Sequence, residues 1–273
     1  MIFFSYYEND IVKFGVFENG EHFCLTDIKD ISEIFEIYGK TPEKLLENRR
    51  RIEGEIKFAP AVQNPQKILC VGLNYENHIG EMKHKKLEVP TIFGKYSNAL
   101  SAHGEKIKLP YEGGHYDYEA ELVAVIGKEC RNVSAKEAEK YIFGYTCGND
   151  LSVREIQKRT SQWLLGKSFD KFAPLGPYIV TADSVDISNL AIKSYVNGSV
   201  RQDARTSDMI FGCAEIVSHV SGYMTLLPGD VIYTGTPGGV ILGKPENEQK
   251  WLESGDRVDI EIENIGKLTT YLI

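Results

Sequence analysis

The sequence predicts a mainly β protein with short helices, an α+β chain whose sheet is closed or rolled rather than doubly wound. Three observations carry this prediction. Most segments beyond residue 66 have the alternation or β-branched content of strands, and their helical interruptions are short. Turns such as Glu112-Gly113-Gly114 and Pro228-Gly229-Asp230 separate these segments. No low-complexity segment and no internal repeat of the solenoid type interrupts the pattern.

Composition narrows the class of protein without naming a function. The chain has 273 residues, of which 42% are hydrophobic and 26% charged, as in an ordinary soluble globular protein. A net charge of −8 argues against nucleic acid as the main partner. No apolar run approaches the roughly 20 residues of a membrane span, and no signal-peptide pattern begins the chain, so no membrane partner is expected. The five cysteines include no C-x-x-C pair, which favours free thiols and a cytoplasmic location.

The first part of the chain is expected to be a small α/β domain over residues 1–62, followed by a larger domain over residues 63–273. The segment KFGVFENGEHFCLTD alternates around Asn19-Gly20, which predicts a β-hairpin. Ile31 to Arg51 is expected to be helical, with Thr41-Pro42-Glu43 as a helix start. The proline-containing segment FAPAVQNPQK is interpreted as a linker.

The segment KILCVGLNY predicts a buried strand that ends at a glycine, and a possible general base follows it. His78 and Glu81 are three residues apart, a spacing that makes them neighbours on a short helix. A carboxylate beside an imidazole fixes the tautomer of the imidazole and raises its basicity, as proton transfer requires. A surface His–Glu pair without a role is the alternative.

Residues 117–127 predict a strand with acidic side chains on one face. Because side chains alternate in a strand, Asp117, Glu119 and Glu121 are expected to point the same way. The opposite face would carry Tyr118, Ala120, Leu122, Ala124 and Ile126. A hard cation such as Mg²⁺ or Mn²⁺ would remove the repulsion among the acids. A solvated acidic edge of an antiparallel sheet is the alternative.

Asp150 ends the segment GYTCGND, directly before the helical stretch LSVREIQKR. It is interpreted either as the N-cap of that helix or as a third carboxylate for the same cation. Short helices are expected at Ser134 to Tyr141, Val153 to Arg159 and Ala214 to Ser221.

Two lysines and a glycine-rich loop are the remaining candidates. Lys167 lies between an apolar run and a phenylalanine, so it needs an anionic partner if it is buried, or else it snorkels to solvent. Lys95 in FGKY raises the same question. In PGDVIYTGTPGGV, the hydroxyl of Thr236 and backbone N–H groups around Gly235 could hold a substrate carboxylate. Glycines that merely permit a tight turn are the alternative.

Taken in order, these motifs resemble the fumarylacetoacetate hydrolase family over about Lys67 to Ile273. The motifs are CVGLNYENH, FGKYSNAL, DYEAELVAVIG, GYTCGNDLSVRE, QWLLGKSFDKFAPLGP, PGDVIYTGTPGGV and SGDRVDIEIENIG. FGKYSNAL and QWLLGKSFDKFAPLGP are most similar to the branch of the fumarylacetoacetate hydrolase domain-containing protein 2 type. The resemblance implies that residues 63–273 are a catalytic domain with the fold of a mixed β-sandwich roll. It also implies a homodimer.

The resemblance assigns a role to each candidate residue. It implies that Glu119, Glu121 and Asp150 bind one Mg²⁺ or Mn²⁺ ion, which leaves Asp117 a supporting role at most. The catalytic residues that it implies are His78 and Glu81, as a water-activating or proton-shuttling dyad, and Lys167. The substrate-binding residues expected are Lys95, Gly235 and Thr236.

The expected function is a Mg²⁺- or Mn²⁺-dependent hydrolase that cleaves a C–C bond in a small 2,4-dioxo acid. An acylpyruvate-like or fumarylpyruvate-like substrate would react through an enolate that the metal stabilises. The alternative is an oxaloacetate keto–enol tautomerase or decarboxylase, or a 2-hydroxyhepta-2,4-diene-1,7-dioate isomerase, with the same site. Within that alternative, the branch resemblance favours oxaloacetate tautomerisation. A non-catalytic protein that binds metal or an oxo acid is a third hypothesis.

Overall fold

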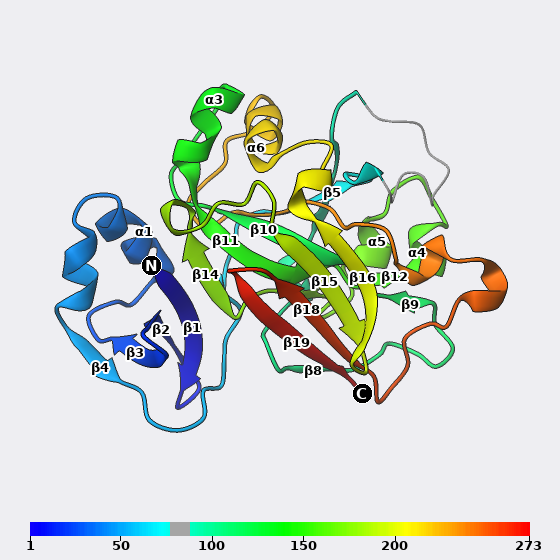
Figure 1. The fold of residues 1–273 in the computed structure, drawn as a ribbon, viewed down its shortest axis with the longest axis horizontal. Helices are drawn as coiled ribbons and strands as arrows, with labels where there is room; N and C mark the ends of the chain where they lie inside the picture. Colours follow the sequence, from blue (N-terminus) through cyan, green and yellow to red (C-terminus); the bar gives the residue numbers. More distant parts are fainter. Residues whose placement is uncertain (77–87) are drawn as a thin grey trace.

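The computed structural model describes residues 1–76 and 88–273, and these residues are mainly β-strands (Figure 1). The strands are β1 (Ile2–Glu8), β2 (Ile11–Glu18), β3 (Glu21–Leu25), β4 (Arg49–Arg51), β5 (Ile68–Gly72), β6 (Thr91–Lys95), β7 (Leu100–Ser101), β8 (Lys106–Ile107), β9 (Tyr116–Asp117), β10 (Ala120–Ile126), β11 (Ile142–Asn149), β12 (Ser152–Val153), β13 (Ala173–Pro174), β14 (Tyr178–Thr181), β15 (Ala191–Val196), β16 (Ser199–Arg205), β17 (Val231–Tyr233), β18 (Arg257–Ile262) and β19 (Gly266–Leu272).

The strands form two main sheets. The larger sheet has ten strands in the order β4-β3-β2-β1-β14-β11-β10-β17-β5-β6, and the smaller has five in the order β16-β15-β18-β19-β8. Two short pairs, β9 with β12 and β7 with β13, lie outside them. The mainly β fold class is therefore confirmed.

The helices are short, as predicted. The α-helices are α1 (Ile31–Tyr38), α3 (Ala135–Ala138), α4 (Arg154–Gln157), α5 (Leu164–Lys167) and α6 (Cys213–Ser221). The 3₁₀ helices are η1 (Pro42–Leu46), η2 (Ser97–Ala99), η3 (Glu139–Tyr141), η4 (Ala182–Ser184), η5 (Thr206–Asp208), η6 (Ile241–Gly243) and η7 (Glu246–Glu248). The three helices expected between residues 134 and 221 are all present. Among the helices of the described residues, none has the length and apolar character needed to span a membrane.

The helical stretch predicted over Ile31 to Arg51 is interrupted after Tyr38 and is wrong beyond Leu46, whereas the helix start predicted at Thr41-Pro42-Glu43 is confirmed. The side chain of Asp30 caps the start of α1 by accepting a hydrogen bond from the Ser32 backbone N–H at 2.8 Å, and the helix ends at Gly39. Pro42, which lacks an N–H for a continuing helix, starts the separate helix η1. Residues 49–51 pair with β3 as the edge strand β4.

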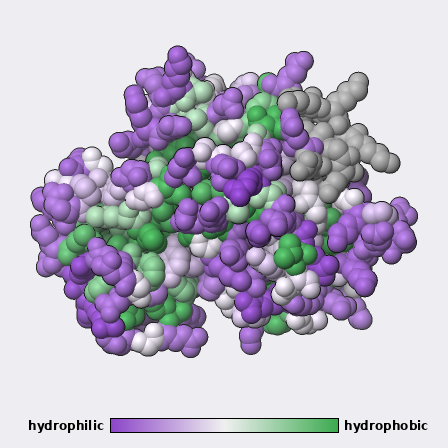
Figure 2. Space-filling model, viewed as in Figure 1, coloured by the Kyte–Doolittle hydropathy of each residue, from purple (hydrophilic) through white to green (hydrophobic). Residues whose placement is uncertain are grey.

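The N-terminal strands extend the large sheet. The predicted hairpin joins β2 to β3, with Asn19 and Gly20 at φ of 53° and 81°, as a two-residue turn of this kind requires. β1 then pairs antiparallel with β14, which places the first strands beside the rest of the sheet (Figure 1). The division at residue 62 stays a prediction, and so does the homodimer. Figure 2 shows a largely hydrophilic face, on which hydrophobic side chains gather mainly over and beside these N-terminal strands.

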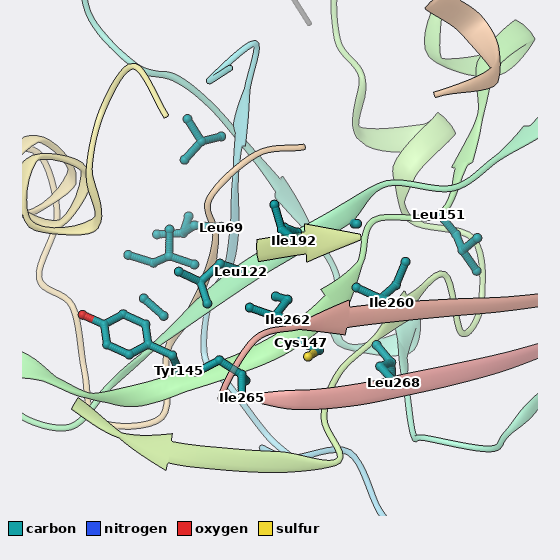
Figure 3. Close-up of a cluster of buried hydrophobic side chains, with 14 of the residues drawn as sticks. Leu69, Leu122, Tyr145, Cys147, Leu151, Ile192, Ile260, Ile262, Ile265 and Leu268 are labelled. Atoms are coloured by element: carbon teal, nitrogen blue, oxygen red, sulfur yellow. The ribbon is translucent and has the colours of Figure 1, made fainter. Parts of the chain in front are cut away.

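The main core lies between the two sheets (Figure 3). Leu122 and Cys147 from β10 and β11 pack with Ile192, Ile260 and Leu268 from the smaller sheet. β10 is buried on both faces, because Val123 and Val125 belong to a second core cluster that includes Phe35 of α1. The predicted alternation is confirmed, because one cluster contains Tyr118, Ala120, Leu122, Ala124 and Ile126. A strand enclosed in this way holds the residues that precede it in fixed positions.

Candidate metal centre

Three buried carboxylates converge where β10 begins and β11 ends. Glu119 and Glu121 are two residues apart and so share a face, and Ala120 pairs with Asn149 across the sheet. Asp150 directly follows Asn149, and its backbone N–H donates to the Glu119 carbonyl at 3.0 Å. One oxygen from each of the three carboxylates lies within 4.8 Å of the other two. Converging carboxylate oxygens are the donor set that a hard divalent cation requires, so this geometry fits Mg²⁺ or Mn²⁺.

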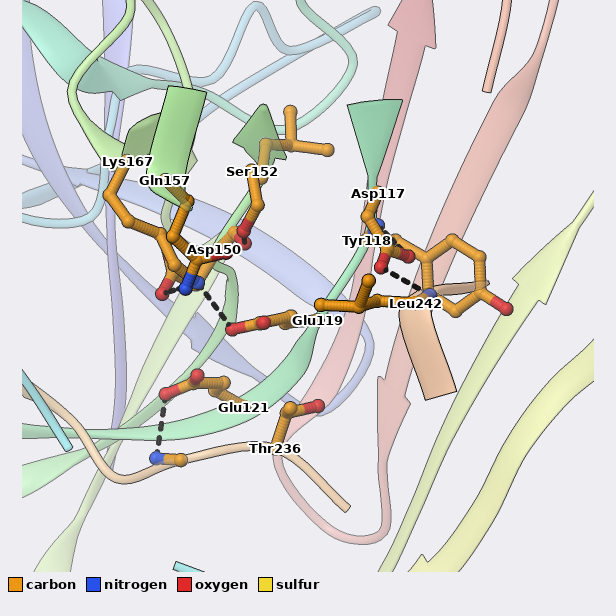
Figure 4. Close-up of polar contacts among 12 residues, drawn as sticks. Asp117, Tyr118, Glu119, Glu121, Asp150, Ser152, Gln157, Lys167, Thr236 and Leu242 are labelled. Atoms are coloured by element: carbon orange, nitrogen blue, oxygen red, sulfur yellow. Dashed lines mark hydrogen bonds and ion pairs between the residues drawn. The ribbon is translucent and has the colours of Figure 1, made fainter. Parts of the chain in front are cut away.

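The carboxylate of Glu121 is held by the glycine-rich loop. The backbone N–H of Gly235 donates to Glu121 Oε2 at 2.7 Å (Figure 4). Gly235 has a φ of +99°, and a Cβ at this position would lie 2.8 Å from the Cβ of Asn74. Only glycine therefore brings this N–H to the carboxylate. Burial raises the pKa of Glu121 well above its ordinary value, and the carboxylates of Asp150 and Glu119 raise it further.

Two buried lysines neutralise part of this negative charge. Lys167 Nζ donates to Glu119 Oε2 at 2.8 Å and to Asp150 Oδ2 at 2.7 Å. Burial acts to lower the pKa of Lys167, but Asp150 and Glu119 outweigh it and raise the pKa, so the ammonium stays charged. Lys95 Nζ donates to Asp150 Oδ1 at 2.5 Å and to two backbone carbonyls, those of Leu151 and Phe172. Asp150 is thus clamped by two lysines and does not cap α4, whose N-cap position is Val153.

Asp117 lies in a different network from the three clustered acids. Its carboxylate accepts from Arg154 Nε at 2.8 Å and from the backbone N–H of Ile241 at 2.9 Å. It also accepts from the backbone N–H of Leu242 at 3.0 Å (Figure 4). Arg154 Nη2 lies 2.7 Å from Glu119 Oε1, so its guanidinium links Asp117 to the cluster. Asp117 leaves the acidic face because β9, which contains it, pairs with β12 rather than continuing into β10.

Arg154 was missed by sequence reasoning, although a signal for it exists. Arg154 and Gln157 are three residues apart in LSVREIQKR, and Arg154 Nη1 donates to Gln157 Oε1 at 2.9 Å across α4. Both side chains are buried, and both line the cavity beside the carboxylates. A buried arginine requires acids around it, and the sequence places Asp117 and Glu119 only two residues apart.

The structure brings most of the predicted site residues together. Thr236 is buried and lines a small cavity that also contacts Glu119 and Lys167. Its hydroxyl accepts a hydrogen bond from Gln202 Nε2 at 2.8 Å, which fixes its position. Lys95 faces Asp150 and does not line this cavity. His78 and Glu81 lie outside the described residues.

Comparisons with known proteins find a family profile whose matched range contains all three carboxylates. The family profile described as the C-terminal part of fumarylacetoacetate (FAA) hydrolase matches residues 67–273. The fumarylacetoacetate hydrolase domain-containing protein 2 homolog of Dictyostelium discoideum is 45% identical over 233 residues, which cover 81% of this chain and 76% of that protein. The mitochondrial oxaloacetate tautomerase FAHD2A of Bos taurus is 41% identical over 223 residues, which cover 80% of this chain and 70% of that protein. Among solved structures, the fumarylacetoacetate hydrolase of Exiguobacterium antarcticum is 32% identical, with a TM-score of 0.90 and coverage of 100% of this chain and 99% of that one.

Proposed function

The chain belongs to the fumarylacetoacetate hydrolase family of enzymes, and we propose that it is a Mg²⁺- or Mn²⁺-dependent tautomerase that interconverts the keto and enol forms of oxaloacetate. The observation that carries the proposal is the convergence of three buried carboxylates within 4.8 Å in a chain 41% identical to an oxaloacetate tautomerase. This activity was the alternative in the sequence analysis. The relatives favour it over C–C bond hydrolysis.

Glu119, Glu121 and Asp150 would hold the ion, which as a Lewis acid would stabilise negative charge that develops on the 2-keto oxygen of the substrate. The protein groups around them prepare this arrangement before any substrate arrives. Gly235 orients Glu121 through its backbone N–H, and Lys95 and Lys167 orient Asp150 through their ammonium groups. Such second contacts fix the ligand oxygens and tune their basicity.

Formal charge explains how an acidic protein could attract an anionic substrate. The carboxylates of Asp117, Glu119, Glu121 and Asp150 face three buried cations, which leaves one formal negative charge in excess. A divalent cation would convert this excess into one formal positive charge. That sign favours the carboxylate of a 2-oxo acid over a neutral ligand, because the site is buried and water screens charge poorly there.

Tautomerisation moves a proton between C3 and the 2-keto oxygen, so one group must accept and return a proton at C3. We assign this step to His78, oriented by Glu81, on the basis of the N-Y-x-x-H-x-x-E motif. Lys167 is not suited to the role of base, because the neighbouring carboxylates keep it protonated. It instead adds positive charge beside Glu119 and Asp150, close to where the substrate would bind.

Hydrolytic cleavage of a 2,4-dioxo acid is the second candidate. The likeness to the Exiguobacterium fumarylacetoacetate hydrolase extends over the whole chain at 32% identity, which supports it. In that reaction His78 would deprotonate a water molecule rather than a carbon. The same ligands and lysines would serve both reactions.

The test is an assay of the purified protein with Mg²⁺ or Mn²⁺ against enol-oxaloacetate, acetylpyruvate and 2-hydroxyhepta-2,4-dienedioate. We expect the wild type to remove the enol absorbance rapidly and Glu121→Gln to lose this activity. His78→Ala should bind the metal normally but show no turnover. Glu253→Gln, at an exposed position, is the control and should leave metal binding and turnover unchanged. Cleavage of acetylpyruvate without oxaloacetate tautomerisation would replace the proposal by the hydrolase reading, and full turnover by Glu121→Gln would refute the metal site.

A further inference from the structure

A small cavity beside the candidate metal centre has two unlike walls. It has a volume of about 50 Å³ and is bounded by residues that lie far apart in the sequence. Glu119, Lys167 and Thr236 contribute to its polar wall, and Phe93, Trp163 and Leu242 contribute to an apolar wall. Sites for drug-sized ligands measure roughly 300–1,000 Å³, so this cavity has room for only a few heavy atoms of a substrate.

The indole of Trp163 is fixed in place by its neighbours. It packs edge-on against the ring of Phe93, with 5.4 Å between the ring centroids and an angle of 70° between their planes. It also lies directly over Gly72, where an added Cβ would be 2.4 Å from the indole Cζ3. Phe93 in turn faces the ammonium of Lys167, which is 5.4 Å from its ring centroid. Trp163 therefore cannot move toward Gly72 or Phe93 to enlarge the cavity.

We propose that Trp163 is a specificity-determining residue that limits the length of the substrate. This inference rests on the proposed function, because it takes a 2-oxo acid held at the carboxylate centre as its starting point. Any molecule that contacts Glu119 in a cavity of about 50 Å³ also comes close to the opposite wall. A four-carbon acid brings the fewest atoms to this wall, whereas each further methylene must displace the indole.

The position of Trp163 in the chain makes this wall rigid. Trp163 directly precedes α5 (Leu164–Lys167), whose last residue is bonded to two of the proposed metal ligands. The wall and the charged end of the cavity therefore belong to one short segment. Closely packed side chains of this kind move little to make room for an added methylene. One methylene in an apolar pocket ordinarily changes the preference between two ligands about 10- to 200-fold.

The test compares a series of 2-oxo diacids that differ by one methylene: oxaloacetate, 2-oxoglutarate and 2-oxoadipate. Binding to the Mn²⁺-loaded protein is measured by titration calorimetry, and turnover of enol-oxaloacetate is measured separately. For the wild type we expect affinity to fall at least about tenfold for each added methylene. In Trp163→Ala the ratio of the affinities for oxaloacetate and 2-oxoadipate should fall at least about tenfold. Trp163→Phe should give a ratio between those of the wild type and Trp163→Ala.

Leu165→Ala is the matched control, because Leu165 lies two residues away on the same helical turn and its side chain is 71% exposed. This variant should keep the wild-type ratios. Wild-type-like ratios in Trp163→Ala, or equal wild-type affinity for all three acids, would overturn the role of Trp163 without touching the tautomerase assignment. The wild type could also discriminate by length, and Trp163→Ala remove that discrimination, while the protein does not tautomerise oxaloacetate. That result would support the role of Trp163 and refute the tautomerase assignment. If no acid binds, both proposals fail.

Discussion

Replacement of Lys95 by methionine separates two roles for this residue, a substrate contact or a support for Asp150. The side chains of Lys95 and Asp150 are both fully buried, and their charged atoms are 2.5 Å apart. The ammonium also donates to the carbonyls of Leu151 and Phe172, so its three protons all have acceptors inside the protein. We predict that Lys95→Met weakens the fold and the metal site, because Asp150 loses one of its two cations.

The magnitude follows from the burial of the pair. Removal of one partner of a buried ion pair costs about 3–5 kcal/mol of the free energy of unfolding, since the remaining charge is left uncompensated. Methionine keeps most of the volume, so little of this loss comes from a cavity. In a chain of this size, roughly 4 kcal/mol corresponds to a fall in Tm of about 10 °C. Loss of a group that orients a ligand typically weakens metal binding about 10- to 100-fold.

The assay is urea denaturation without metal, together with calorimetric titration of Mn²⁺. Lys171→Met is the control, because Lys171 is 47% exposed and its pair with Glu105 should contribute at most about 1 kcal/mol. A Lys95→Met protein with wild-type stability and Mn²⁺ affinity but a raised KM would refute this reasoning. That result would restore Lys95 to the substrate-binding role that the sequence suggested.

Two further predictions concern Glu121 and the glycine that holds it. Because burial and two neighbouring carboxylates raise the pKa of Glu121 well above 4.5, the metal-free protein loses stability as the pH rises above about 4.5, whereas Glu121→Gln avoids this loss. Without metal at pH 7, Glu121→Gln should therefore unfold at higher urea than the wild type, and excess Mn²⁺ should reverse the order; the same order under both conditions would contradict this. Gly235→Ala should cost about 1–3 kcal/mol of unfolding free energy and weaken Mn²⁺ binding, because φ is +99° and the new Cβ would meet Asn74. Unchanged Mn²⁺ affinity in Gly235→Ala would show that its N–H is not needed to orient Glu121.

The strand pattern was predictable because its physical causes are local. Alternation in residues 117–127 is enough to place Glu119 and Glu121 on one face, and the turn chemistry of Asn19-Gly20 is enough to place a hairpin. For Asp150 the local pattern left two interpretations open, an N-cap or a third ligand, and only the family resemblance decided between them. Its proximity to Glu119 depends on the pairing of β10 with β11, which no local pattern specifies.

The network around the three acids could not be predicted, because it depends on tertiary contacts. Asp117 fits the same alternating pattern as Glu119, yet its carboxylate is drawn to Arg154 and to two backbone N–H groups near residue 241. The substrate-binding role of Lys95 stays a prediction, and a single sequence gives no means of counting the acceptors around its ammonium. The helix expected over Ile31 to Arg51 failed for a local reason, since Gly39 and Pro42 are both helix-ending residues.

The buried cations imply that the carboxylate centre can fold before it binds metal. Lys95, Lys167 and Arg154 each contact at least one of the clustered acids, so most of the repulsion among those acids is offset by the protein itself. The core between the two sheets involves none of these groups. A metal that creates its own site, as in small zinc domains, would leave the chain unfolded when removed. Here a chelator should abolish turnover, while the far-ultraviolet circular dichroism spectrum and the cooperative unfolding transition both persist. Loss of that transition would show that the buried cations alone do not stabilise the metal-free fold.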